Sequence, residues 1–300
     1  ACCKEASSPM PATGATIKPE QSITHSPFFD GSLKPGNLFF QMAKISVVIN
    51  TLNAERLLEK CLLSIQDADE IIICDMYSED RTIEIAKKFN CKIVYHQKTG
   101  IVEPARNWAM DQAAGEWILV LDADEMVTPE LWQELKSYAA DPIPGYYACA
   151  LTRETVIMGK VLRSWRQNKC KRFWKKGTCT YSNRIHEMPI TNTGKDHVIK
   201  GKNLHILHYH IPSISNFQEK TNLYTDFEIK RFSAQNRKMS LSKLMLRPIA
   251  EFIKYYILKG GFREGTHGYV FARLKAHYKF IQWAKLYEKE FKEKNPHLIY

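Results

Sequence analysis

The chain has 300 residues, of which 44% are hydrophobic and 25% charged, so it can bury a substantial core. No apolar run approaches the roughly 18 residues that a membrane-spanning helix needs, so we expect no such helix. The net charge of +11 is unevenly placed, because residues 200–300 hold 19 Lys and Arg against 8 Asp and Glu, while residues 1–199 are balanced. The two parts are therefore expected to have different functions, with the basic part suited to binding anions.

Eight cysteines are present, and none of them forms a C-x-x-C pair. Most lie inside apolar patterns, where a free thiol packs as a small hydrophobic group. A reducing compartment fits this usage, and we expect a cytoplasmic protein.

Residues 1–42 are rich in Pro, Ser, Thr and Gly and show no sustained hydrophobic period, so they are predicted to form a disordered leader. They lack the apolar core of a secretory signal. We assign this leader no role.

The segment from 44 to 121 alternates between strands and helices. Unbroken apolar runs predict strands at 45–49, 71–74, 93–95 and 117–121, and apolar residues at helical spacing predict helices between them. Strands that are apolar throughout are covered on both faces, which is typical of a mostly parallel sheet flanked by helices. The predicted fold class is therefore α/β.

The alternation ends after a helix that begins at Thr128 and Pro129, with Thr128 as its N-cap. Residues 145–210 are predicted to form strands and loops, and the chain beyond 213 turns helical, most clearly at 241–257 before Gly260 and Gly261. The predicted organisation is a catalytic domain at 43–212, with a nucleotide-binding part at 43–137 and an acceptor part at 138–212. A basic helical region at 213–300 follows it.

Acidic residues follow two of the predicted strands. Asp75 comes after the strand at 71–74, while Asp122 and Asp124 follow the strand at 117–121. Ligands bind beyond the carboxyl ends of the strands in an open α/β sheet, so these carboxylates are expected to line one crevice. An Asp-x-Asp pair offers oxygen ligands to Mg²⁺ or Mn²⁺ and leaves positions open for phosphate oxygens, although such a pair alone can also be a solvated turn.

Several ordered motifs make the metal interpretation more specific. They are Ile45-Ser46-Val47-Val48-Ile49-Asn50-Thr51-Leu52-Asn53-Ala54-Glu55, Cys74-Asp75-Met76-Tyr77-Ser78-Glu79-Asp80-Arg81-Thr82, Ala105-Arg106-Asn107, Ala114-Gly115-Glu116 and Trp117-Ile118-Leu119-Val120-Leu121-Asp122-Ala123-Asp124-Glu125. Over residues 44–137 the chain closely resembles the family 2 glycosyltransferases, which have the GT-A fold. A weaker resemblance, to the subgroup that includes lipopolysaccharide core β-glucosyltransferases, rests on Arg172-Phe173, Ile185-His186-Glu187, His208-Tyr209, Lys220 and Gly261-Phe262-Arg263-Glu264-Gly265.

The resemblance implies roles for individual residues. Asp75 would contact a uracil base, Asp122 the ribose or the metal, and Asp124 the metal and the diphosphate. The implied donor-binding set is Thr51, Asn53, Glu55, Asp75, Arg106, Asp122, Arg172 and His208, with Mg²⁺ or Mn²⁺ on Asp124 and Asp122. Tyr77 and Arg81 stand where the family usually has glycines, which puts the nucleotide identity in doubt more than the use of a nucleotide.

By the same likeness Glu187 is the expected general base that removes the acceptor proton, with a salt-bridged surface carboxylate as the alternative. If Glu187 does not serve, the acidic residues after Asp124, beginning with Glu125, are the next candidates. The histidines His205, His208 and His210 lie at the end of a predicted strand. Alternate positions of a strand face opposite ways, so the three are not expected to share one ion. Only His208 is expected at the metal or diphosphate.

Two basic stretches have more than one interpretation. Residues 163–176 interleave cations with aromatics and are either a solvated loop or a site for the diphosphate, with Arg172 the one position that a motif supports. The helix at 241–258 carries an apolar stripe flanked by Lys243, Arg247, Lys254 and Lys259, which either packs on its own domain or lies on an anionic membrane surface. No recognised nucleic-acid-binding module is visible, so nucleic acid is not an expected partner.

The sequence therefore predicts an inverting, metal-dependent glycosyltransferase that uses a nucleotide sugar, with UDP-hexose expected, at the cytoplasmic face of a membrane. The expected acceptor is a saccharide or lipid-linked molecule, such as lipopolysaccharide core or another envelope glycan. One alternative is a sugar-phosphate nucleotidyltransferase, which should carry a Gly-rich, cationic loop after its first strand. The other is a non-enzymatic basic protein that binds nucleic acid or membranes.

Overall fold

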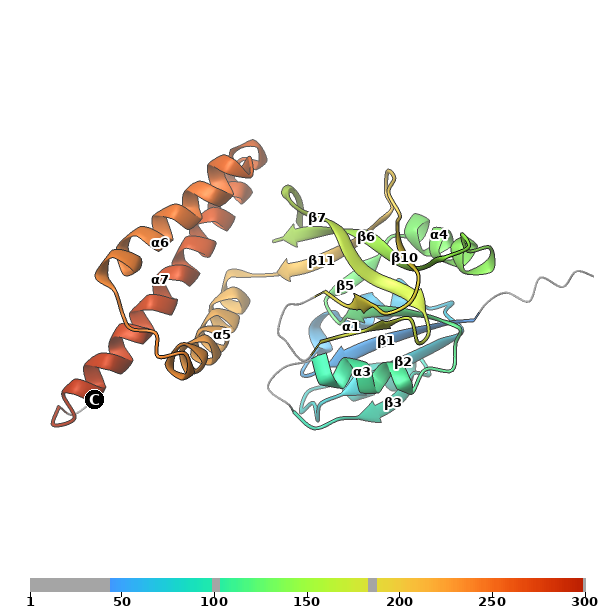
Figure 1. The fold of residues 1–300 in the computed structure, drawn as a ribbon, viewed down its shortest axis with the longest axis horizontal. Helices are drawn as coiled ribbons and strands as arrows, with labels where there is room; N and C mark the ends of the chain where they lie inside the picture. Colours follow the sequence, from blue (N-terminus) through green and yellow to red (C-terminus); the bar gives the residue numbers. More distant parts are fainter. Residues whose placement is uncertain (1–43, 99–102, 183–187, 299–300) are drawn as a thin grey trace, which may run out of the picture. The chain divides into compact units, whose positions relative to one another are not determined.

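The computed structural model describes residues 44–98, 103–182 and 188–298 of the chain. The predicted leader at 1–42 and the predicted base Glu187 lie outside these residues. The predicted fold class is confirmed: the protein has a mixed, mostly parallel central sheet flanked by helices, followed by helices at the C-terminal end (Figure 1).

Four parallel strands form the first half of the sheet, in the order β3-β2-β1-β4. They are β1 (Ile45–Thr51), β2 (Glu70–Asp75), β3 (Lys92–Tyr95) and β4 (Trp117–Asp122). The helices between and after them are α1 (Glu55–Leu63), α2 (Thr82–Lys88), α3 (Glu103–Asp111) and α4 (Pro129–Ala140). In the register of this sheet Thr51 lies beside Asp75 and Asn50 lies beside Asp122, so the strands end together at one edge.

Alternate side chains of these strands enter two separate cores. Val47, Ile49 and Leu119 pack with α1, α2 and α4, whereas Val48 and Ile118 pack with α3 on the other face. Helices therefore cover both faces, which explains why the strand sequences are apolar throughout. Figure 1 shows α3 along the three strands β1, β2 and β3.

Gly115 allows the chain to pass close to β1 just before β4 begins. Its amide donates to Ser46 Oγ at 2.8 Å, and a Cβ added at this position would lie 2.6 Å from the same oxygen. A side chain would displace Ser46, so the start of β4 requires glycine beside β1.

The second half of the sheet is antiparallel where it joins the first. It contains β5 (Glu125–Val127), β6 (Tyr146–Ile157), β7 (Lys160–Lys175), β10 (Lys195–Val198) and β11 (His205–Ile211). Strand β7 pairs with β4, the long β6–β7 hairpin follows, and β11 lies between β6 and β5. A small separate sheet pairs β8 (Cys179–Thr180) with β9 (Ile190–Thr191).

Thr128 stands before α4 as predicted, but its side chain does not cap the helix. The hydroxyl instead donates to the carbonyl oxygens of Asn203 and His205, at 2.5 and 3.0 Å. Thr128 therefore ties α4 to β11 and helps to fix the strand that carries the histidines.

The C-terminal helices are α5 (Ile214–Ala234), α6 (Leu241–Ile253) and α7 (Thr266–Lys294), with a π-helical turn η1 (Lys254–Leu258) and a 3₁₀ turn η2 (Gly261–Glu264) between α6 and α7. Helix α6 runs alongside α7 (Figure 1). A cluster that includes Ile157, Ile211, Tyr255 and Phe271 joins the ends of β6 and β11 to these helices. Within the described part of the chain no helix is long and apolar enough to cross a bilayer, and the six described cysteines are free thiols.

Candidate active site

The turns after β1 and β2 are joined by side-chain hydrogen bonds. Asp75 is fully buried and accepts from the Thr51 and Ser78 hydroxyls at 2.7 and 2.6 Å and from the Ser78 amide at 2.8 Å. Asn53, which has a positive φ of 50°, accepts from the Glu79 amide through its Oδ1 at 2.8 Å. The predicted donor-binding residues Thr51, Asn53 and Asp75 therefore belong to one rigid loop pair.

Tyr77 and Arg81, the two departures from the family pattern, lie in this loop pair. Arg81 donates from its backbone amide and its Nε to Glu55 Oε2, at 3.1 and 3.3 Å, and so closes the turn. Tyr77 has a φ of 60°, a conformation that glycine adopts more easily, and its exposed ring stacks on Tyr95 with centroids 5.5 Å apart. The family's glycine is thus replaced by an exposed aromatic surface beside Asp75.

Asp122, at the end of β4, is held by two arginines. Arg106 from α3 pairs with Oδ1, and Arg172 from β7 donates to Oδ2 at 2.7 Å. Burial alone would raise the pKa of the Asp122 carboxyl, but the two guanidinium groups outweigh burial and hold that pKa well below its usual range. Asp122 is therefore an anion whose two oxygens already have partners.

Glu125, at the start of β5, is completely buried and belongs to the same network. Its Oε1 accepts from Arg172 and Arg153, each at 2.8 Å, and its Oε2 accepts from the Asp122 amide at 3.0 Å. A carboxylate with these partners and no exposed surface orients its neighbours, so Glu125 is not placed to take a proton from an acceptor.

Asp124 is the member of the Asp-x-Asp pair that faces His208 and Lys220, whereas the oxygens of Asp122 pair with arginines. Its side chain is 24% exposed, and its two oxygens face His208 Nε2 and Lys220 Nζ, both at 3.5 Å. Burial raises the pKa of the Asp124 carboxyl, but His208 and Lys220 together lower it below its usual value. Asp124 is thus an anion that faces two nitrogen groups, each 3.5 Å from one of its oxygens.

A divalent cation fits this arrangement at Asp124 and His208. Two ligand atoms about 2.1 Å from one ion and roughly at right angles are about 3 Å apart, close to the observed 3.5 Å between carboxylate oxygen and imidazole nitrogen. The described residues contain no group of three or more His, Cys, Asp or Glu that could hold an ion. The donor set present therefore suits Mg²⁺ or Mn²⁺, which often rely on one or two carboxylates together with substrate phosphates.

The three histidines of β11 differ in their partners, and the rings of His208 and His210 lie next to each other with centroids 5.2 Å apart. His205 Nε2 lies 3.6 Å from Glu154, whereas His208 faces Asp124. Burial, followed by the charge of His208, lowers the pKa of His210 to about 3, so this imidazole stays neutral at physiological pH. His208 is therefore the histidine of the three that faces the Asp-x-Asp pair.

Arg172 is the member of the predicted cationic stretch at 163–176 that reaches the aspartates. Others have different partners: Arg166 pairs with Glu154, Lys171 with Asp196 and Lys175 with Glu116. The stretch as a whole is therefore a strand with several local ion pairs.

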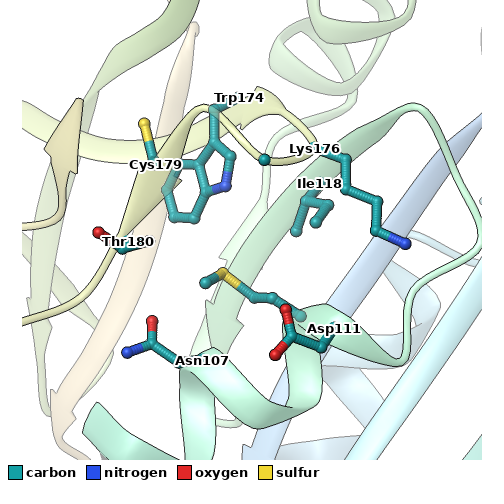
Figure 2. Close-up of a pocket in the computed structure, with 9 residues that line it drawn as sticks. Asn107, Asp111, Ile118, Trp174, Lys176, Cys179 and Thr180 are labelled. Carbon is teal, nitrogen blue, oxygen red and sulfur yellow. The ribbon is translucent and has the colours of Figure 1, made fainter. Parts of the chain in front are cut away.

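A separate pocket of about 220 Å³ lies against α3 and the beginning of β4 (Figure 2). Ile118 and Asp111 line it, and the buried Trp174 indole faces it with an N–H that has no hydrogen-bond partner among the described residues. Ile118 precedes Asp122 by four residues, about 13 Å along a strand. This pocket is therefore distinct from the aspartate site.

The sequence did not point to Arg153 or Tyr181 as members of the site. The Tyr181 ring lies under the Arg106 guanidinium, 5.2 Å from centroid to carbon, and its backbone is held by the Asn107 side chain at 2.9 Å. Polar Arg153 within the apolar β6 was the one available signal, since a buried cation needs a partner. Its partner could not be named without the β6–β7 register.

Comparison with protein families decides the assignment. The family model for glycosyl transferase family 2 matches residues 46–208, which is more than half of the chain. The chain belongs to glycosyltransferase family 2. It is therefore a glycosyltransferase, and the Asp122 to Glu125 site lies within the matched residues.

Relatives of this family 2 glycosyltransferase cover most of its length. An uncharacterized glycosyltransferase of Rickettsia typhi is 29% identical over 85% of this chain and 90% of its own. The lipopolysaccharide core biosynthesis glycosyltransferase LpsC of Rhizobium meliloti is 25% identical over 85% of this chain and 96% of its own, which agrees with the subgroup resemblance. The solved structure of S. aureus TarS 1–349 has a TM-score of 0.43 and 14% identity, covering 80% of this chain and 91% of that one.

The arginine network of this enzyme gives a stability prediction. Arg172→Met should lower the free energy of unfolding by about 3–5 kcal/mol, because it leaves buried Glu125 and Asp122 without a shared cation. Urea unfolding measures the loss, with Arg163→Met, an exposed position on the same strand, as the control. A loss no larger than that of the control would contradict the network's structural role.

The same variant has a pH signature. The pKa of Asp122 is depressed in the folded protein, so its stabilising contribution is complete above the unfolded value of about 3.9 and is lost as the pH falls below it. The stability difference between wild type and Arg172→Met should therefore be largest at neutral pH and shrink below about pH 4.

Proposed function

We propose that this glycosyltransferase moves a sugar from a nucleotide-sugar donor, with UDP-hexose the first candidate, to a saccharide or lipid-linked acceptor. One observation carries the proposal: Asp75 ends β2 and the Asp122–Asp124 pair lies at the end of β4, at the same edge of the sheet and with β1 between the two strands. Two strand spacings are about 10 Å, a separation that suits a nucleoside at Asp75 and its diphosphate at Asp124.

Within this proposal the donor end is divided between the two loops. Asp75 and the exposed Tyr77 would meet the base, Asn53 and Glu55 hold the loop that carries them, and Asp122 would approach the ribose. Arg106 and Arg172 fix the orientation of Asp122, because each pairs with one of its oxygens.

At the diphosphate end, Asp124 and His208 would hold Mg²⁺ or Mn²⁺, and Lys220 offers a further positive charge 3.5 Å from Asp124. The bound cation would neutralise charge on the leaving diphosphate. The residues of this chain supply the positioning: the β5–β11 pairing places His208 opposite Glu125 and hence beside Asp124.

We propose an inverting reaction. The acceptor hydroxyl oxygen forms a bond to the anomeric carbon, the bond from that carbon to the diphosphate oxygen breaks, and the hydroxyl proton passes to a base, for which Glu187 is the candidate. The likeness to LpsC supports lipopolysaccharide core or a related envelope glycan as acceptor. We propose the cytoplasmic face of a membrane as the place of reaction.

A sugar-phosphate nucleotidyltransferase is the rival enzyme. In such an enzyme the loop after the first strand would present free amides to a triphosphate. Here the amides of Asn53, Ala54 and Glu55 donate to Ser78, Thr82 and Asp80, at 2.8, 2.8 and 3.0 Å. These three amides are therefore already bonded to side chains of the protein, which favours glycosyl transfer over nucleotidyl transfer.

The test is incubation of the purified full chain with a panel of nucleotide sugars and Mn²⁺, with and without a chelator. We expect release of a nucleoside diphosphate that the chelator abolishes and that one acceptor class accelerates. Release of pyrophosphate from a sugar phosphate and a nucleoside triphosphate would favour the rival enzyme, and no turnover with any donor would reject the proposal.

A further inference from the structure

Helix α6 and the turns after it expose a run of large apolar side chains. None of the residues of α6 is buried. Eight large apolar side chains between 241 and 262 are 44 to 77% exposed: Leu241, Met245, Leu246, Ile249, Ile253, Ile257, Leu258 and Phe262. Single exposed apolar residues are ordinary, but a contiguous set of this kind marks a surface that binds something.

The exposed residues are not the ones that attach α6 to the protein. Leu244 packs against the cluster of Phe232 and Trp283, and Phe252 packs against the cluster of Tyr255 and Phe271. Helical residues advance by about 100° each, so Met245, Ile249 and Ile253 form a strip beside this packing face. The face of α6 that packs on the protein and the exposed strip are thus two different faces of one helix.

Cations border the exposed strip. Lys243, Arg247 and Lys254 lie along one edge of it at helical spacing, and Lys259 and Arg263 follow; all five are exposed. The segment holds only two acidic residues against these five cations: Glu251 lies 3.5 Å from Lys254, one of the five, and Glu264 accepts from the Ser164 amide at 2.9 Å. The border of the strip is therefore positive.

We propose that α6, η1 and η2 form a docking surface for an anionic lipid membrane, with the apolar strip at the acyl boundary and the cations among the headgroups. Each cation near such a surface gains about 1 kcal/mol, and this charge favours lipid over a second copy of the chain, which carries the same net charge of +11. The inference rests on the proposed function in one respect, because a lipid-linked acceptor would be met at the membrane.

Vesicle sedimentation of the full chain tests the surface, using phosphatidylcholine vesicles with or without phosphatidylglycerol. We expect binding to the anionic vesicles that weakens with salt. Met245→Asp and Ile249→Asp should each reduce partitioning roughly tenfold or more, because each removes a buried apolar group from the lipid interface. Arg247→Glu should weaken binding to anionic vesicles only.

Two matched variants on α1 serve as controls: Leu63→Asp, which alters an exposed leucine, and Arg56→Glu, which reverses an exposed cation. Both should bind vesicles like wild type. Equal binding of the α6 variants and wild type would overturn the proposal, as would wild-type binding that ignores lipid charge and salt. Self-association that Ile249→Asp abolishes, without vesicle binding, would assign the strip to a second copy instead.

The proposed glycosyl transfer and the proposed membrane surface can be rejected independently of each other. Calorimetric binding of UDP with Mn²⁺ should be the same for wild type and for the α6 variants, because the strip lies outside the aspartate site. Loss of donor turnover with intact vesicle binding would reject the proposed function alone, whereas intact turnover without vesicle binding would reject the membrane surface alone.

Discussion

Asp124→Asn should abolish the Mn²⁺-dependent binding of UDP to this enzyme. An amide is a poorer ligand than a carboxylate for a hard cation, and the change also leaves the positive charge near His208 and Lys220 without its anion. Isothermal calorimetry with UDP, with and without Mn²⁺, measures the effect. Asp141→Asn, at an exposed position after α4, is the matched control and should bind like wild type.

Asp122→Asn provides the contrast. Both oxygens of Asp122 already accept from arginines, so its replacement should weaken metal-dependent binding less than the change at Asp124. Unchanged UDP affinity of Asp124→Asn in the presence of Mn²⁺ would remove Asp124 from the site. An equal and complete loss in both variants would instead indicate that the two aspartates bind the ion together.

The first half of the fold was predictable because its physical signal is local. Strands β1, β2 and β4 are covered on both faces, so their sequences are apolar throughout, and each is followed by a helix of regular period. The second half gave weaker signals. Strand β11 lies at His205–Ile211, within the stretch 145–210 for which only strands and loops could be predicted, and the long β7 holds many polar residues because part of this strand is exposed.

The acidic edge of the site was predictable for the same reason, since parallel strands end together and Asp75, Asp122 and Asp124 follow two of them. The arginine partners were not all predictable. Arg106 lies in a motif, but the contact of Arg153 with Glu125 depends on how β6 pairs with β7 and β11, a register that no local pattern fixes. Periodicity likewise showed that α6 is amphipathic but not which face α7 covers.

The structure also narrows the choice of catalytic base. Glu125 was the next candidate after Glu187, but its oxygens accept from two arginines and one amide, and its side chain has no exposed surface. Asp122 has the same kind of partners and a pKa far below that of a useful base. Glu187 lies outside the described residues, and its assignment still rests on its motif, Ile185-His186-Glu187.

Glu187→Gln should therefore reduce glycosyl transfer by roughly 10² to 10⁴, the usual scale of general-base catalysis. Glutamine keeps the size of the side chain and most of its hydrogen bonding but cannot accept the acceptor proton. The affinity for UDP and Mn²⁺ should barely change, because the groups proposed to bind the donor lie in other segments of the chain, namely β1, β2, β4, β7, β11, α1, α3 and the turns after β1 and β4. Transfer rates at saturating donor and calorimetry on the same preparation separate the two effects.

Glu59→Gln, at an exposed position on α1, is the matched control and should retain normal transfer. Near-normal transfer by Glu187→Gln, or a loss of donor binding as severe as that of Asp124→Asn, would show that the base lies elsewhere. Glu125 is buried between arginines, so the next residue to replace would be His186, which precedes Glu187 in the sequence. If His186 is the base, the transfer rate should fall as the pH drops through about 6.5, the ordinary pKa of a histidine side chain.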